Sequence, residues 1–305
     1  MPLPRTPYEF TIEQGSSLRS TAKQLVSAGV AREPWSIEAL GRISGKAGSI
    51  RAGNYEVAQS LTPWKLLQFV SGNNYTLDQL RLDEGATFRQ LRQALDQHPT
   101  LRHDSARLTD EGILTAIGAA EKNPEGLFFP DTYMFSKNTR DLAVLQRAYR
   151  RMQEKLIPLW NNRAPGLPLD SPYQALVLAS LIEKETGRAD ERRLVAAVFV
   201  NRLRADMKLQ TDPSVIYGVG PAFDGNLRKR DLLADSPYNT YVRNGLPPTP
   251  IALPGLASIS AALDPAPSTA LYFVARGDGS SHFSNSLAEH NSAVAKYQRP
   301  SVNSR

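Results

Sequence analysis

Residues 171–187 read SPYQALVLASLIEKETG, and this stretch predicts the helix around which the rest of the chain packs. Ser171 followed by Pro172 is a favourable helix start, because a hydroxyl caps the first turn and proline fits the first helical position. Gly187 is a favourable stop. Between these signals, residues 175–182 are almost all apolar, which predicts a helix that is buried on every side.

The predicted helix ends in two acidic residues that differ in their surroundings. At about 100° per residue, Glu183 and Glu185 point in nearly opposite directions. Glu185 lies above Leu181 and Leu178, and burial among apolar groups raises the pKa of a carboxyl group. A raised pKa keeps a proton available near neutral pH, as a general acid requires. Spacing alone supports equally a second interpretation, in which both carboxylates are solvated at a helix end.

Composition limits the classes of function. The chain has 305 residues, enough for roughly two or three domains. Its net charge of +6 favours an anionic partner, although so mild a charge is also ordinary for solubility. Positive charge is dispersed among acidic residues, which disfavours a nucleic-acid interface. No stretch of about 20 apolar residues is present to span a bilayer, and residues 1–8 do not resemble a signal peptide.

The sequence predicts neither a metal site nor a cofactor. There are no cysteines, so thiolate nucleophiles and cysteine metal sites are excluded. The cluster of His282, Glu289 and His290 has no recognisable metal-binding spacing. Phosphate-binding glycine loops and a Gly-x-Ser-x-Gly nucleophile motif are likewise missing from the sequence.

Periodicity predicts an α+β fold. Strands at 8–14 and 50–57, with two helices between them, predict a small α/β module. Residues 126–135 are aromatic and contain proline, which disfavours a helix. Two short strands around the turn at 276–280 predict a hairpin. We expect a small module at 8–79, a helical connecting subdomain at 80–170, and a mainly helical catalytic body with a small β-sheet at 171–305.

Two polar segments downstream of the long helix are candidates for ligand contact. In the first, residues 208–218, Asp212-Pro213 predicts a helix start at which Asp212 is the cap and, secondarily, a ligand contact. The second, residues 236–250, is rich in tyrosine, asparagine and threonine. Aromatic faces with amide and hydroxyl groups suit sugar rings, but a proline-rich irregular loop needs the same turn residues.

Several strings in this chain resemble the YceG-like family of endolytic murein (lytic) transglycosylases. They run in order over more than half of the chain and together are highly specific. They are Leu178–Gly187, Val195–Arg204, Leu209–Gly218, Tyr238–Tyr241, Gly245–Pro248 and Leu271–Val274, with further matches at Arg51–Tyr55 and Phe128–Phe135. Residues 10–25 are similar to the opening of a LysM peptidoglycan-binding module, which implies that the module at 8–79 is LysM-like.

The resemblance implies an activity and a catalytic residue. The family cleaves the MurNAc–GlcNAc β-1,4 bond within nascent glycan strands, leaves 1,6-anhydro-MurNAc ends and thereby terminates strand elongation. Its catalytic glutamate matches Glu185, which acts first as a general acid and then as a base. The sugar-binding residues that we expect are Gln210, Thr211, Asp212, Tyr217, Asn239, Thr240 and Tyr241. Because the substrate is a long strand, we expect Glu185 to lie in an open groove.

The resemblance also implies a location and partners. The family has a single N-terminal span in the inner membrane and a catalytic body in the periplasm, and this sequence departs from that pattern by lacking the span. The expected partners are peptidoglycan glycan strands and peptidoglycan synthases. An alternative function is a non-catalytic peptidoglycan-binding or scaffold protein of the cell envelope.

Overall fold

A computed structural model describes residues 8–57 and 61–298, which divide into two compact units. Among these residues, the first unit takes those up to Arg81 together with Gln93–Leu108 and Thr132–Val144. The second unit takes Leu82–Arg92, Thr109–Asp131 and the residues from Leu145 onward. Two helices, α4 (Phe88–Asp96) and α6 (Asp141–Asn161), have residues in both units. The three-part division predicted from the sequence stays a prediction.

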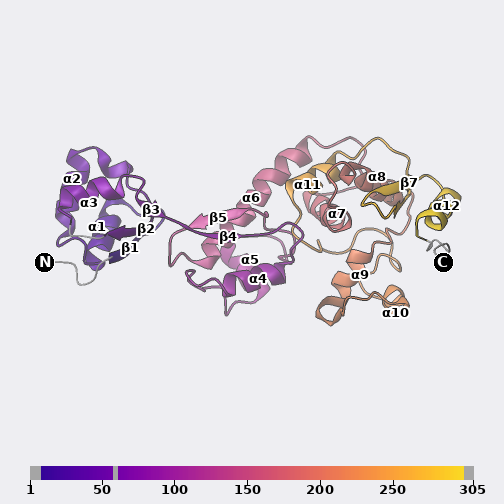
Figure 1. The fold of residues 1–305 in the computed structure, drawn as a ribbon, viewed down its shortest axis with the longest axis horizontal. Coiled ribbons are helices and arrows are strands. Elements are labelled where there is room, and N and C mark those ends of the chain that lie inside the picture. Colours follow the sequence, from indigo (N-terminus) through magenta and orange to yellow (C-terminus); the bar gives the residue numbers. More distant parts are fainter. Residues whose placement is uncertain (1–7, 58–60, 299–305) are drawn as a thin grey trace, which may run out of the picture. The chain divides into compact units, whose positions relative to one another are not determined.

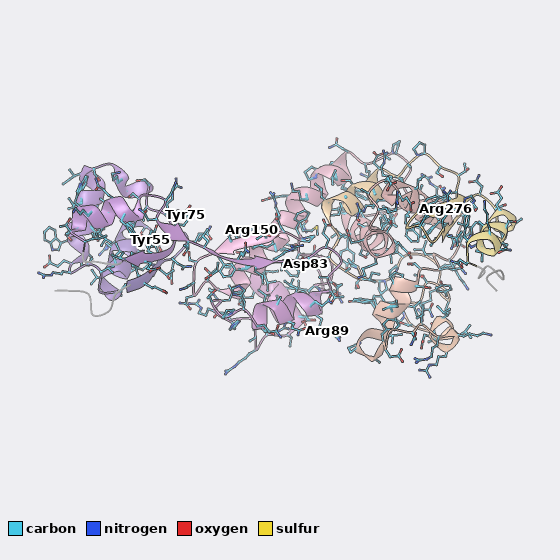
Figure 2. The ribbon with its side chains drawn as sticks, in the orientation of Figure 1. Tyr55, Tyr75, Asp83, Arg89, Arg150 and Arg276 are labelled. Carbon is cyan, nitrogen blue, oxygen red and sulfur yellow. The ribbon has the colours of Figure 1, made fainter. Side chains whose placement is uncertain are left out.

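The first unit begins with two helices enclosed between antiparallel strands, as the sequence predicts for the N-terminal module. Its elements are β1 (Tyr8–Ile12), α1 (Leu18–Ser27), α2 (Pro34–Ile43), the 3₁₀ turn η1 (Lys46–Gly48), β2 (Gly53–Val57), α3 (Pro63–Val70) and β3 (Tyr75–Thr76). Strand β2 lies between β1 and β3. Tyr55 and Tyr75 face each other across β2 and β3 (Figure 2), with ring centroids 6.2 Å apart. Leu25, Ile37 and Leu66 are buried beside Tyr55 and complete this core.

A second, two-stranded sheet completes the first unit. Strand β4 (Asp78–Arg81) pairs antiparallel with β5 (Thr132–Phe135), and Leu80 lies opposite Tyr133. The sequence indicates only an irregular segment at 126–135, yet its last four residues form a strand. Their side chains alternate between exposed and buried, so β5 covers the apolar interior with one face.

The second unit is organised around the predicted long helix, α7. Its elements are α5 (Asp110–Ile117), α7 (Pro172–Glu185), α8 (Arg192–Arg204), α9 (Asp212–Val219), the 3₁₀ turn η2 (Gly220–Ala222), α10 (Lys229–Leu233), α11 (Leu256–Leu263), β6 (Tyr272–Ala275), β7 (Ser281–Ser284) and α12 (Leu287–Tyr297). Helices α8, α9 and α11 all contact α7. Figure 1 shows α8 and α11 beside it. Every residue of α7 from Ala175 to Ile182 is buried, as its apolar sequence predicts.

The ends of α7 follow from local chemistry. The Ser171 hydroxyl accepts a hydrogen bond from the Gln174 amide at 3.3 Å, and Pro172 occupies the first turn. The helix ends at Glu185, two residues before the predicted stop at Gly187, because Thr186 adopts an extended conformation. Glu185 is therefore the last helical residue, where its side chain leaves the buried part of the helix.

The predicted hairpin is confirmed. Strands β6 and β7 pair antiparallel, and α12 begins with a capping box in which Ser286 and Glu289 each accept a backbone hydrogen bond. The small sheets and many helices confirm the predicted α+β class. Among the described residues, no helix is both long enough and apolar enough to cross a membrane.

We expect Leu178→Ala to destabilise the second unit by about 2–5 kcal/mol, because it leaves a cavity in a fully buried helix. Leu287→Ala is the matched control: this leucine is 56% exposed, so its loss should cost at most about 0.5 kcal/mol. Replacing Trp35 and Trp64 by phenylalanine leaves Trp160 as the fluorescent reporter for the second unit. Urea unfolding followed at Trp160 measures both costs, and equal costs would contradict the central position of α7.

Candidate active site

Glu185 accepts a short hydrogen bond from the hydroxyl of Thr211, the residue that precedes α9. Burial raises the pKa of the Glu185 carboxyl, the Thr211 hydroxyl lowers it by stabilising the anion, and the charge of Asp212 raises it. The net effect is an increase, as helical phase predicts. The side chain keeps part of its surface exposed. This arrangement leaves a carboxylic acid that can hold a proton and still reach a ligand.

Glu183 has a different function from Glu185. Its Oε2 accepts a hydrogen bond of 2.9 Å from the amide of Gly255, which caps the N-terminus of α11. A carboxylate at a helix N-terminus is stabilised by the unpaired amides and by the helix dipole. Glu183 therefore joins α7 to α11, and of the two acids Glu185 is the one directed toward α9.

The start of α9 differs from the sequence prediction. Asp212 was expected to cap the helix, and this prediction is wrong: Thr211 is the N-cap residue and Asp212 is the first helical residue. The Thr211 hydroxyl makes no capping bond because it is directed to Glu185. Asp212 accepts a hydrogen bond of 2.5 Å from the hydroxyl of Tyr241. Both side chains thus serve the surroundings of Glu185 rather than the helix end.

Thr240 joins the two polar segments that the sequence predicts as ligand contacts. Its carbonyl accepts from the Gln210 amide at 3.1 Å, and its hydroxyl accepts from the Thr211 amide at 3.0 Å. The same hydroxyl lies 2.9 Å from that of Ser214. These bonds place Gln210, Thr211 and Asp212 beside Thr240 and Tyr241. Thr240 is itself buried, so it holds the backbone of the Gln210–Asp212 segment from the interior of the protein.

Asn239 is also buried and holds its loop together. Its amide nitrogen donates to the carbonyls of Asp231, Leu232 and Ala234, and its side-chain oxygen accepts from the Tyr241 amide. Both polar atoms of the Asn239 side chain therefore form hydrogen bonds to the protein itself. The expectation that Asn239 binds sugar stays a prediction, and the geometry gives this residue a supporting position.

Arg202 is a residue of this site that the sequence does not single out. It is buried on α8 and donates to the carbonyls of Lys208 and Leu209 and to the side-chain oxygen of Gln210. Gln210 has a φ of 52°, a conformation that non-glycine residues adopt rarely and at a cost. Arg202 thus stabilises a strained turn directly before Thr211. The sequence signal for this role of Arg202 is an arginine on the buried face of an otherwise apolar helix.

Tyr217, near the other end of α9, is half-buried and donates to Oε2 of Glu125 at 3.0 Å. Its ring makes an edge contact with Tyr238, with centroids 4.9 Å apart. Burial raises the pKa of Glu125 to about 7. Sequence reasoning also missed Glu125, although an acid between a proline and an apolar run of residues is unusual. The expectation that Tyr217 binds sugar stays a prediction.

In the described part of the chain, no three His, Asp or Glu side chains are close enough to hold a metal ion. The polar groups around Glu185 are instead carboxylate, hydroxyl, amide and phenol groups that suit a neutral, hydroxyl-rich ligand. They can supply a proton and several hydrogen bonds to such a ligand.

Comparison with known proteins places this architecture in a family. The YceG-like family matches residues 10–296, which is nearly the whole chain. The chain belongs to the YceG-like family. It is 32% identical to the endolytic murein transglycosylase of Bacillus subtilis, over 96% of this chain and 85% of that protein. It is 25% identical to the protein of the same name from Streptococcus pneumoniae, over 97% of this chain and 62% of that one.

A solved structure has the same fold. The crystal structure of a YceG-like protein from Listeria monocytogenes is 28% identical and superposes with a TM-score of 0.60. The match covers 94% of this chain and 99% of the Listeria chain.

We expect Thr211→Val in this YceG-like protein to raise the pKa of Glu185 further, because valine keeps the shape but removes the hydroxyl that stabilises the anion. Thr211→Ser, which keeps the hydroxyl, should leave the pKa near that of the wild type. Carboxyl ¹³C NMR titration, assigned with Glu185→Gln, measures both. A titration that Thr211→Val does not change would show that the hydroxyl has no effect on the acid.

We expect Glu125 to make the protein less stable as pH rises. Its pKa is about 7 in the folded state and near 4.5 otherwise, so the folded state binds the extra proton between these values. The free energy of unfolding should therefore fall by about 3 kcal/mol from pH 4.5 to pH 7 through this group. The anion of Asp110 adds to the increase in pKa, whereas the hydrogen bonds from Phe88 and Tyr217 oppose it.

Glu125→Gln cannot ionise, so its unfolding free energy should fall less over the same range of pH. Urea unfolding at about pH 5 and about pH 8 gives the comparison. Some pH dependence remains in the variant because the raised pKa of Glu185 acts in the same direction. If the unfolding free energy falls by the same amount between the two pH values in the variant and in the wild type, the increased pKa of Glu125 is contradicted.

Proposed function

We propose that this protein is an endolytic murein lytic transglycosylase that cleaves the MurNAc–GlcNAc β-1,4 bond within glycan strands and leaves 1,6-anhydro-MurNAc ends. The proposal is supported by its relatives, which are named endolytic murein transglycosylases and resemble it over most of the chain. The observation that carries it in the structure is the half-buried, protonatable Glu185, which is hydrogen-bonded to Thr211 at the edge of a polar loop.

One carboxyl group is sufficient for this reaction. Protonated Glu185 donates its proton to the oxygen that leaves C1 of MurNAc, and the C1–O bond breaks. The resulting carboxylate then takes the proton of the C6 hydroxyl of the same sugar, and O6 bonds to C1. No water is consumed, so the second carboxylate of an ordinary glycosidase is not required. Glu185 ends in its initial protonation state.

The neighbours of Glu185 fit this cycle. The Thr211 hydroxyl stabilises the carboxylate after the first proton transfer, and the Asp212 anion favours the protonated form in which the cycle starts. Gln210 is exposed and Tyr241 is half-buried, so both side chains retain surface for sugar hydroxyls and ring faces. The buried Thr240 fixes their positions from behind.

Hydrolysis is the second candidate, and one observation favours it. Asp212 is close enough for its charge to raise the pKa of Glu185, so a second carboxylate is present to activate water. However, Asp212 already accepts the Tyr241 hydroxyl at 2.5 Å, and this bond reduces its availability as a base. The transglycosylase proposal is therefore the stronger one. The two reactions differ in product mass, because the anhydro product is one water lighter.

The proposal extends to the setting of the reaction. We propose that the protein acts at the inner membrane with its catalytic body in the periplasm. There it ends the elongation of strands made by peptidoglycan synthases. The resemblance of its motifs to the family supports this setting. Fractionation of cells that produce the full-length protein, together with crosslinking to the synthases, tests it. Recovery outside the envelope would overturn it.

We expect Glu185→Gln to lower the release of anhydro-muropeptides from purified sacculi by about 100- to 10,000-fold, since glutamine cannot transfer a proton. Glu154→Gln, on an exposed part of α6, is the control and should retain full activity. Mass spectrometry of the products measures both.

Other results of this assay would point to other functions. Unchanged release by Glu185→Gln would show that the catalytic assignment is wrong. Products that carry the extra water would identify a hydrolase, and Asp212→Asn should then abolish activity. A wild-type protein that binds sacculi without cleaving them would be the non-catalytic binding or scaffold protein.

A further inference from the structure

Glu125 is a buried acid that has no place in the proton transfers described above. Its side chain belongs to the second unit and the residue is only 4% exposed. A carboxyl group in such a position is destabilising unless it is protonated or accepts hydrogen bonds. Its presence beside a helix of the candidate active site therefore requires an explanation.

Several hydrogen-bond donors converge on this carboxyl group. The Phe88 amide, at the start of α4, donates to Oε1 at 2.8 Å, and the Tyr217 hydroxyl donates to Oε2 at 3.0 Å. The Phe88 ring stacks on Phe128 with centroids 5.3 Å apart, which fixes the position of that amide. Glu125 is thus held rigidly on one side and holds Tyr217 on the other.

The segment that carries Glu125 is itself held in place. Gly126 has a φ of 77°, and a side chain there would lie 2.4 Å from the ring of Pro250. The neighbouring Thr249 hydroxyl lies 3.0 Å from that of Tyr238, whose ring contacts Tyr217. The carboxyl group of Glu125 is therefore a fixed point against which Tyr217 is located.

Tyr217 and Thr211 belong to the two ends of the same short helix. Thr211 is the N-cap of α9, and Tyr217 lies six residues further on, about 9 Å along the axis. A helix of this length moves as a rigid body, so a hydrogen bond at Tyr217 restrains the rotation and translation of Thr211. The two carboxyl groups, Glu125 and Glu185, thus bind α9 at its two ends.

We propose that Glu125 is a positioning residue that, through Tyr217 and α9, holds the Thr211 hydroxyl against the carboxyl group of Glu185. The expected effect on the rate of glycan cleavage rests on the function proposed above. The expected effect on the pKa of Glu185 does not. Glu125 need not touch the substrate. Together with the hydrogen bonds between Thr211 and Thr240, it keeps in place the hydroxyl that stabilises the Glu185 anion.

The ionisable groups around Glu125 agree with this role. Its pKa of about 7 leaves a large anionic fraction near neutral pH, and an anion is the stronger acceptor for a phenol. Asp110 on α5 raises this pKa, while Tyr217 on α9 lowers it. Tyr173 on α7 is a third titratable neighbour, and burial raises its pKa to about 12, so it stays neutral.

The protein contains a matched control pair. Glu121, four residues before Glu125, accepts a hydrogen bond of 3.0 Å from the Tyr149 hydroxyl on α6. This pair has the same chemistry in the same segment but does not involve α9. A general loss of packing would affect both pairs alike, whereas of the two pairs only Glu125–Tyr217 is connected to Thr211 through α9.

The test compares Tyr217→Phe and Glu125→Gln with Tyr149→Phe and Glu121→Gln, all in the full chain and after circular dichroism has shown that each is folded. We expect the first two variants to raise the pKa of Glu185, read by carboxyl ¹³C NMR titration, because the Thr211 hydroxyl moves away. They should lower kcat on glycan strands on the order of tenfold, with KM nearly unchanged. The double variant should lose no more than either single variant.

Three outcomes would overturn the proposal: a Glu185 titration unchanged in both Tyr217→Phe and Glu125→Gln, equal effects in the control pair, or additive losses in the double variant. A loss expressed in KM alone would instead make Tyr217 a sugar contact. If the wild-type protein releases no anhydro product, the proposed function fails, but the NMR titration still decides whether Glu125 positions Thr211.

Discussion

The cost of burying the Glu185 carboxyl group is the constraint on which the second unit depends. An apolar helix delivers this acid to a site where its charged form is poorly solvated, so its pKa rises. The Thr211 hydroxyl compensates in part and in doing so ties the end of α7 to the start of α9. Reactivity and structure are therefore coupled, because the bond that stabilises the anion also joins two helices.

Three buried or partly buried acids in this unit show that environment, rather than residue type, determines their function. Glu183 accepts the amide at the start of α11 and serves as a structural cap. Glu125 has a pKa of about 7, yet rigid donors occupy both of its oxygens. Glu185 combines a raised pKa with an exposed surface and a single hydroxyl partner. This combination, and not the pKa alone, identifies the candidate acid.

Much of the frame was predictable because it follows from local chemistry. The cap at Ser171, the proline after it and the apolar run predicted α7, and helical phase separated the two terminal acids. The β5 strand was missed because its partner, β4, lies about fifty residues earlier. The cap of α9 was misassigned because a tertiary contact diverts Thr211 from its usual role, and no local pattern reveals that contact.

The sequence by itself determined the fold class, the buried helix, the position of Glu185 at its end and, through its motifs, the resemblance to the YceG-like family. These properties depend on periodicity and on residue order, which are local. Tertiary structure alone decided which groups surround the acid: Thr211 and Asp212 from α9, Thr240 and Tyr241 from the following loop, and Arg202 and Glu125 as their supports. Hydrogen bonds between segments that are distant in the chain depend on distances in space, and sequence spacing does not encode them.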